Sequence, residues 1–172
     1  MNRIVGFALA AGISVAVLSS TLLVQAESTG DRAALARALQ AAWLPLESAI
    51  TMSQSEGTPI SAKYEVEDGN FQLSVYTMKA GVFSEVIVDY SGGMIAKVER
   101  LADAGDLAAA QAQKDVLAKA TRTLAEATAE VVRQNSGYRA VHAMPSLEEE
   151  HPVVEVILFN GSDWKTVTVH LD

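Results

Sequence analysis

The sequence passes twice through the same order of elements: an apolar helix pattern, a glycine, and then short β-branched runs separated by turn residues. Gly57 and Gly137 are 80 residues apart, as are Ala49 and Ala129, whereas Phe83 and Trp164 are 81 apart. One extra residue within 146–150 would explain the change of offset. An offset that changes by only one residue over the two halves predicts two similar units that arose by duplication. The alternative is chance similarity between two amphipathic segments.

The strand-like runs alternate apolar and polar residues and end at turn signals. Lys79-Ala80-Gly81 and Asn160-Gly161 are turns short enough for hairpins, and Asp68-Gly69-Asn70 is a third. Neighbouring strands are therefore expected to pair antiparallel. The predicted strands are residues 60–66, 71–78, 82–89 and 94–98 in the first half, and 138–144, 153–159 and 164–171 in the second.

Two helical regions precede these strands. The first is predicted over residues 31–44, with Asp31 at its start, and stops or kinks before Pro45, which lacks a backbone N–H. A short helix follows over residues 46–54. The second region is predicted as one helix over 106–134, because apolar residues recur there at steps of three and four. That stripe consists of Leu117, Ala120, Leu124, Ala127 and Val131.

The predicted fold is α+β, with two units, each a helix packed on a three- or four-stranded antiparallel sheet. The first unit spans residues 27–100 and the second spans 101–172. The helix over 31–44 is extra to the repeat and could bridge the units. One shared sheet and two separate lobes are both compatible with the sequence.

Residues 1–26 are predicted to be a secretory signal peptide. Arg3 gives a basic start, Ile4 to Leu18 is free of charge, and Val24-Gln25-Ala26 has the small residues that a signal peptidase needs. The alternative is an uncleaved anchor, because Ile4 to Val24 could just span a bilayer. No Cys lies near the cleavage site, so a lipoprotein anchor is excluded. The predicted location is the periplasm, or the medium, after cleavage.

Charge and cysteine content narrow the classes of partner. The formal net charge is −8, and loss of the leader removes only Arg3, so the mature charge is about −9. Such a chain repels nucleic acid and anionic lipid, so neither is an expected partner. The sequence has no Cys, so the exported protein depends on its core rather than on disulfides.

No catalytic constellation is recognisable, and the chain is predicted not to be an enzyme or to hold a cofactor. Cys is absent and no G-x-S-x-G elbow occurs. Ser48, Ser53 and Ser55 lie near a helix end, where capping is the ordinary role. The acidic run Glu148-Glu149-Glu150 is interpreted as a solvated hairpin turn.

A metal site is the main alternative. The three histidines are His142, His151 and His170, and none has the H-x-x-x-H or H-x-H spacing of a metal motif. His142 and His170 could approach across neighbouring strands, and Met144 would add a soft ligand. No metal ligand is assigned on this basis, but the possibility defines the alternative function: a periplasmic protein that binds a metal or small ligand.

The stretch Val88 to Ala96 contains an acid followed by two glycines, and Asp89 is expected to accept N–H bonds from the turn that follows it. Eight aromatic residues are expected mostly in the core, because they occur at helix or strand spacing. They are Trp43, Tyr64, Phe71, Tyr76, Phe83, Tyr138, Phe159 and Trp164.

These patterns together resemble the PepSY domain. In the first half the resemblance is carried by residues 46–50, Gly57, Tyr64-Glu65-Val66 and the stretch Val86 to Gly93. The second half looks like a diverged copy, with Ala127, Gly137, Val154-Glu155-Val156 and Val167-Thr168-Val169, but His170 stands where Asp89 stands.

The resemblance implies an exported α+β module that acts through a surface. It carries no catalytic residues over to this chain. PepSY-like modules occur in propeptides of secreted metallopeptidases and as free-standing envelope proteins, with an inhibitory or chaperone-like role toward peptidases proposed for them. The expected function is therefore a non-enzymatic binding or regulatory module of the envelope, with a protein or peptide partner and a peptidase as one candidate. The sequence leaves the partner and the oligomeric state open.

Overall fold

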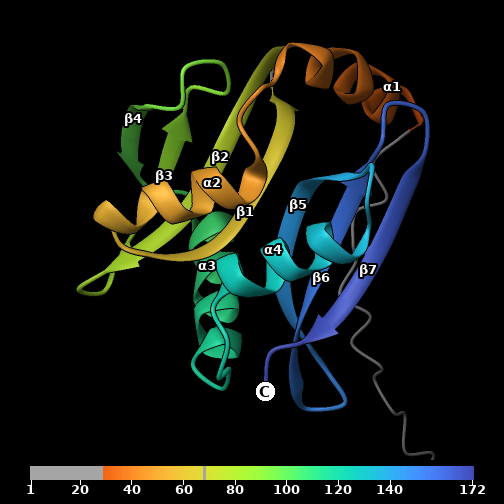
Figure 1. Cartoon of the computed structure of the whole chain (residues 1–172). Helices are drawn as coiled ribbons and strands as arrows, with labels where there is room; N and C mark the ends of the chain where they lie inside the picture. The colour runs from red at the N-terminus through yellow and green to blue at the C-terminus, as the bar shows by residue number, and fades with distance from the viewer. Residues whose placement is uncertain (1–28, 68) are drawn as a thin grey trace, which may run out of the picture.

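The computed structural model describes residues 29–67 and 69–172 (Figure 1). The predicted signal peptide, residues 1–26, lies outside these residues. Position 68, in the predicted turn 68–70, also lies outside them. Within the described part of the chain, no helix combines the length and the apolar character needed to cross a membrane.

Helices and strands alternate in the predicted order. The helical elements are α1 (Thr29–Ala38), the 3-10 turn η1 (Leu39–Ala41), α2 (Leu46–Met52), the 3-10 turn η2 (Ser53–Ser55), α3 (Ala104–Leu117) and α4 (Leu124–Gln134). The strands are β1 (Thr58–Glu67), β2 (Asn70–Lys79), β3 (Val82–Val88), β4 (Ile95–Arg100), β5 (Arg139–Glu148), β6 (His151–Phe159) and β7 (Trp164–His170).

All seven strands form one antiparallel sheet in the order β4-β3-β2-β1-β5-β6-β7. The α+β class and the antiparallel pairing of neighbours are confirmed. The two expected units do not form separate sheets, because β1 pairs with β5 at the centre through Ala62↔Ala143 and Lys63↔His142. The sheet is therefore continuous from one half of the chain to the other.

The pairing register of the first hairpin recurs in the second at a constant offset of 81. Thr58 pairs with Met78 as Arg139 pairs with Phe159, and Leu73 pairs with Val88 as Val154 pairs with Val169. The register shifts of β1 and β5, at Pro59/Ser61 and Ala140/His142, are also 81 apart. The expected extra residue in 146–150 is therefore wrong, since the strands keep one offset from their first residue.

The helices follow a different offset from the strands. Leu46 and Ala49 of α2 are buried as Leu124 and Ala127 of α4 are, which is an offset of 78. The predicted match of Ala49 with Ala129 is wrong, because Ala129 faces solvent. Alpha-helix α4 simply runs longer than α2 before its strand begins.

The two faces of the sheet carry different helices (Figure 1). Alpha-helices α2 and α4 pack side by side on one face, where side chains of both halves form the main core. Alpha-helix α3 lies on the other face, against β1 and β5, where Ala110 packs in a smaller cluster with Ile60 and Phe83. Because successive strand residues alternate faces, Val86 joins the main core while Phe83 joins the smaller one.

The predicted single helix over 106–134 is wrong. It is two helices, α3 and α4, joined by the linker 118–123. A capping box starts α4: Thr123 Oγ1 accepts the Glu126 N–H, and the Glu126 carboxylate accepts the Thr123 N–H. These bonds satisfy N–H groups that a continuous helix would have bonded internally. The apolar spacing runs through the break and conceals it.

The prediction for the Asp89 turn is confirmed. Asp89 Oδ1 accepts from the backbone N–H and the hydroxyl of Ser91, at 2.9 and 2.7 Å. These bonds hold the pKa of the Asp89 carboxyl below its ordinary value. Gly93 takes a left-handed φ of 67°, and its N–H donates to the Asp89 carbonyl. The pattern turns the chain between β3 and β4.

Candidate functional site

Two short linkers, each leading into a core helix, are tied to the sheet in the same way. The backbone N–H groups of Trp43 and Leu44 both donate to the Tyr90 carbonyl, at 2.9 and 3.0 Å. In the second half those of Thr121 and Arg122 both donate to the Leu171 carbonyl, at 2.7 and 3.0 Å. Each acceptor follows the third strand of its half, so the linkers occupy corresponding places.

This correspondence gives the first helix, α1, a counterpart in the second half. Leu39 accepts from the Ala42 N–H at 3.2 Å, as Leu117 accepts from the Ala120 N–H at 3.2 Å. The end of α1 with η1 therefore corresponds to the end of α3. The helix predicted to be extra to the repeat has a counterpart in chain order, although α1 and α3 run in different directions (Figure 1).

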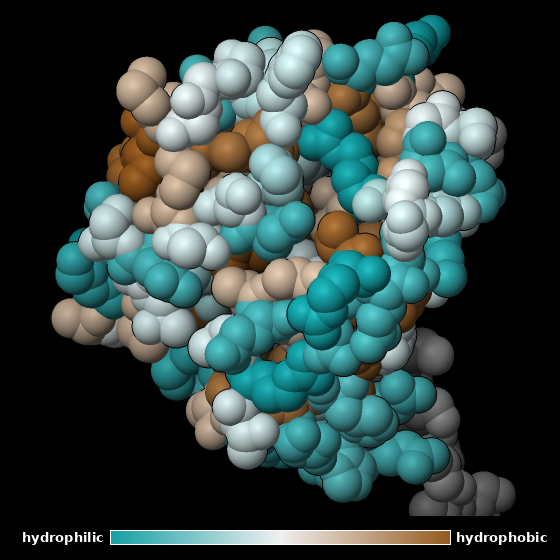
Figure 2. Space-filling view, in the orientation of Figure 1, coloured by the Kyte–Doolittle hydropathy of each residue, from teal (hydrophilic) through white to brown (hydrophobic). Residues whose placement is uncertain are grey.

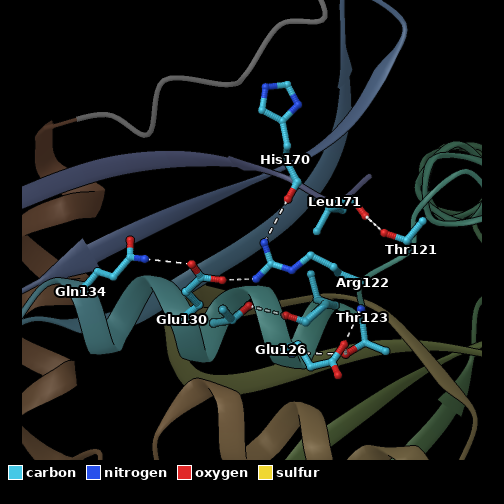
Figure 3. A network of polar contacts seen from close by, with 10 residues as sticks. Thr121, Arg122, Thr123, Glu126, Glu130, Gln134, His170 and Leu171 are labelled. Atoms are coloured by element: carbon cyan, nitrogen blue, oxygen red, sulfur yellow. Dashed lines mark hydrogen bonds and ion pairs between the residues drawn. The ribbon is translucent and has the colours of Figure 1, made fainter.

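The second linker is fixed by a polar network (Figure 3). The Arg122 guanidinium forms an ion pair with Glu130 and donates to the His170 carbonyl at 3.3 Å. Gln134 donates to the other carboxylate oxygen of Glu130 at 2.8 Å. The side chain of Arg122 is thus directed toward β7 and α4.

A cleft of about 600 Å³ lies between this linker, the end of α2 and the start of the β1–β2 pair. We call it the linker cleft. Its volume is within the range of small-molecule and side-chain binding sites. The residues lining it are Ile50, Gln54, Gly57, Thr58, Pro59, Met78, Lys79, Ala80, Leu117, Ala120, Thr121, Arg122, Thr123, Leu124 and Ala125. The Lys79 ammonium donates to the Ser55 carbonyl at 3.2 Å and remains a positive charge at the wall of the cleft.

At the corresponding place, between the first linker and the start of β5, Arg139 occupies the space. Its guanidinium donates to the carbonyls of Leu39, Ala42 and Leu44, at 3.3, 2.8 and 3.2 Å. It also reaches the Tyr64 hydroxyl at 3.3 Å and lies over that ring. The cleft left beside it is about 320 Å³. Arg139 was missed by sequence reasoning, and the only signal was an arginine at the start of a predicted strand.

His142 and His170 are not brought together. His142 pairs with Ile157, which pairs with Thr166, so His170 is two strands away and four residues further along β7. His142 and Met144 instead line a small cavity of about 120 Å³ beneath α3. Burial, helped by the Lys63 ammonium, lowers the pKa of His142 to about 4. The same ammonium would oppose a bound cation there.

The other histidines meet at the end of the sheet. His151 Nδ1 is 2.6 Å from Asp172 Oδ2, and His170 Nδ1 is 3.6 Å from Asp172 Oδ1. The bond from His151 lowers the pKa of the Asp172 carboxyl. In the part of the chain that the structure describes, no group of three His, Cys, Asp or Glu side chains is placed to hold a metal ion.

The other residues singled out in the sequence lie in turns of the fold or on its surface. Ser53 is buried in η2, and the hydroxyl of Ser55 bonds the Met52 carbonyl. Glu149 and Glu150 turn the β5–β6 hairpin with φ of 48° and 69°, and their side chains face solvent. Trp43, expected in the core, is 82% exposed, whereas its neighbour Leu44 packs against the main core.

Comparisons with protein families, with curated proteins and with solved structures find no match for this chain. The resemblance to the PepSY domain therefore stays a prediction from the residues quoted above.

Proposed function

We propose that this protein is an exported, non-enzymatic binding or regulatory module of the cell envelope whose partner is a protein or peptide. Loss of the predicted leader would place it in the periplasm or the medium. A peptidase is a candidate partner through the resemblance to the PepSY domain. We also infer that the repeated register and the repeated linker bonds descend from a duplication of one such unit, which agrees with the predicted division at residue 100.

The observation that carries this proposal is the exposure of large apolar side chains on fixed backbone. Trp43 is 82% exposed and Met94 is 66% exposed. Their segments are joined, because Tyr90 accepts both linker N–H groups and Met94 accepts the Asp89 N–H at 2.8 Å. An exposed tryptophan on an ordered segment is the residue type that most often dominates protein interfaces. The face carrying α2 and α4 is otherwise a mixture of hydrophilic and hydrophobic residues (Figure 2).

Cross-linking in a periplasmic extract tests the proposal. The protein, the variant Trp43→Ala and the control variant Val82→Ala are used as baits, since Val82 is also an exposed apolar residue but lies on the β2–β3 hairpin and not on the linker that bears Trp43. We expect one protein to be recovered reproducibly, at least tenfold less with Trp43→Ala and unchanged with Val82→Ala. Failure to recover any protein reproducibly, or equal recovery with Trp43→Ala, would contradict the proposal. A recovered peptidase would then be assayed with and without the protein.

A further inference from the structure

Corresponding clefts in the two halves of the protein differ in the side chain that occupies them. Positions correspond at an offset of 81 in the strands and 78 in the linkers, as the pairings and linker bonds above define. Leu39, Ala42 and Leu44 therefore correspond to Leu117, Ala120 and Arg122. Arg139, the first residue of β5, corresponds to Thr58, the first residue of β1.

The carbonyls of the first half that bind the Arg139 guanidinium have counterparts in the second half that bind none. Leu117, Ala120 and Arg122 all line the linker cleft, and so does Thr58. The Leu117 carbonyl keeps its bond from the Ala120 N–H, as Leu39 does in the other half. Among residues 29–67 and 69–172, no hydrogen bond is donated to the carbonyl of Ala120 or of Arg122. Thr58 is too short to reach across as Arg139 does, and its side chain is exposed.

We propose that the linker cleft binds an arginine side chain of a partner protein, in the way that Arg139 is bound within the chain. This inference rests on the proposed function for its biological meaning. The guanidinium is planar with five N–H donors, so it can bond several separated carbonyls at once, whereas an ammonium is a compact point charge. The protein's net charge of −8 attracts a basic group at long range. Within the cleft Arg122 is paired with Glu130, but the Lys79 ammonium opposes a second cation and weakens its binding.

The site differs from its internal template in its lining and in its size. Lys79 at the wall of the linker cleft corresponds to Asn160 in the other cleft. Tyr64, whose hydroxyl contacts Arg139, corresponds to Pro145, which has no side-chain acceptor. The cleft is also larger, at about 600 Å³ against about 320 Å³. A free arginine side chain therefore enters without the chain around it having to move, and it forms fewer bonds than Arg139 does. We expect binding of a single arginine to be weak and to gain strength only within a larger interface.

The experiment is a titration of the ¹⁵N-labelled protein with capped tripeptides, followed by NMR. The probes are acetyl-Gly-Arg-Gly-amide, its lysine analogue and its citrulline analogue, which is nearly the same shape but neutral. We expect saturable shifts at Thr58 and at residues 120–123 with the arginine peptide, with a dissociation constant in the millimolar range. The lysine peptide should bind several-fold more weakly and the citrulline peptide at least tenfold more weakly.

The variant Thr58→Arg supplies the missing arginine from within the chain, as Arg139 does in the other half. It should abolish the shifts at residues 120–123, while Thr58→Ser should keep them. Equal binding of the citrulline peptide, shifts unchanged in a folded Thr58→Arg, or no saturable shift with the arginine peptide would each overturn the inference. The comparison with the citrulline peptide and the test for a saturable shift are both made on the unaltered protein, so neither depends on a variant that folds. The protein with Trp43→Ala should bind the tripeptide normally, so a partner captured through Trp43 without tripeptide binding refutes the cleft and leaves the proposed function standing.

Discussion

Arg139 joins the second half of the chain to the linker of the first, and its loss should be among the costliest single changes. Its guanidinium donates to three linker carbonyls of the segment Leu39–Leu44. In Arg139→Ala all three carbonyls lose the guanidinium. Leu39 keeps the Ala42 N–H and Leu44 keeps the Tyr64 hydroxyl, while Ala42 has no other donor among the described residues, so we expect a loss of about 2 kcal/mol in the free energy of unfolding. Arg139→Lys should recover part of it. Urea unfolding measures both.

The exposed Arg133 on α4 is the matched control for that measurement. Arg133→Ala should change the stability by less than about 0.5 kcal/mol. If Arg139→Ala were equally mild, the guanidinium would be a surface group, and the comparison between the two clefts would lose its basis.

His142 should make the protein less stable as the pH falls. Its pKa is about 4 in the folded protein because of burial and the Lys63 ammonium, against about 6.5 in the unfolded chain. Between these values the unfolded chain binds a proton and the folded protein does not, so stability is lost from pH 6.5 down to pH 4. The loss should be on the order of 2 kcal/mol at pH 4.5.

The variant His142→Gln isolates that contribution from the carboxylates, which also titrate in acid. Urea unfolding of both proteins at pH 7 and pH 4.5 should show a smaller acid loss in the variant. An identical loss in the two proteins would mean that His142 is solvated and titrates normally in the fold.

At the scale of elements, the start of α4 depends on its capping box rather than on apolar periodicity. Thr123→Ala removes the acceptor of the Glu126 N–H, so we expect a loss of about 1 kcal/mol, while Thr123→Ser keeps the hydroxyl and most of the stability. Thermal or urea unfolding of the three proteins gives the comparison. If alanine were neutral, water would serve this N–H as well as the threonine does.

The strands could be predicted and the helix break could not, for a physical reason. The alternation of apolar and polar residues, and the residues that form turns, depend on neighbouring positions in the chain. The role of Asp89 and the turn at Lys79-Ala80-Gly81 could therefore be predicted from the sequence. The break between α3 and α4 contains no Pro or Gly, and the apolar steps from Leu117 to Leu124 continue through it. The pattern Thr-x-x-Glu at Thr123 and Glu126 was the one signal that could have shown it.

At the scale of the molecule, the candidate site depends on relations that no local pattern contains. Arg139 bonds carbonyls about a hundred positions away, and Thr58, which stands in the corresponding place, lines the linker cleft. The repeat itself was visible in the sequence, but its helices and strands have different offsets. The hydrogen bonds to Tyr90 and Leu171, together with the buried positions of α2 and α4, identify which linker residues correspond.

The two halves should not fold apart, even though each carries a full set of elements. The main core draws on both: Leu46 and Ile50 from one half pack in the same cluster as Leu124 and Val131 from the other. The β1–β5 ladder has only two residue pairs, so this shared core is the main connection between the halves. The fragments 27–100 and 101–172 should each give an NMR spectrum without dispersion, and their equimolar mixture should recover the dispersed spectrum of the whole chain. A fragment that folds as a monomer would show instead that each half has a sufficient core of its own.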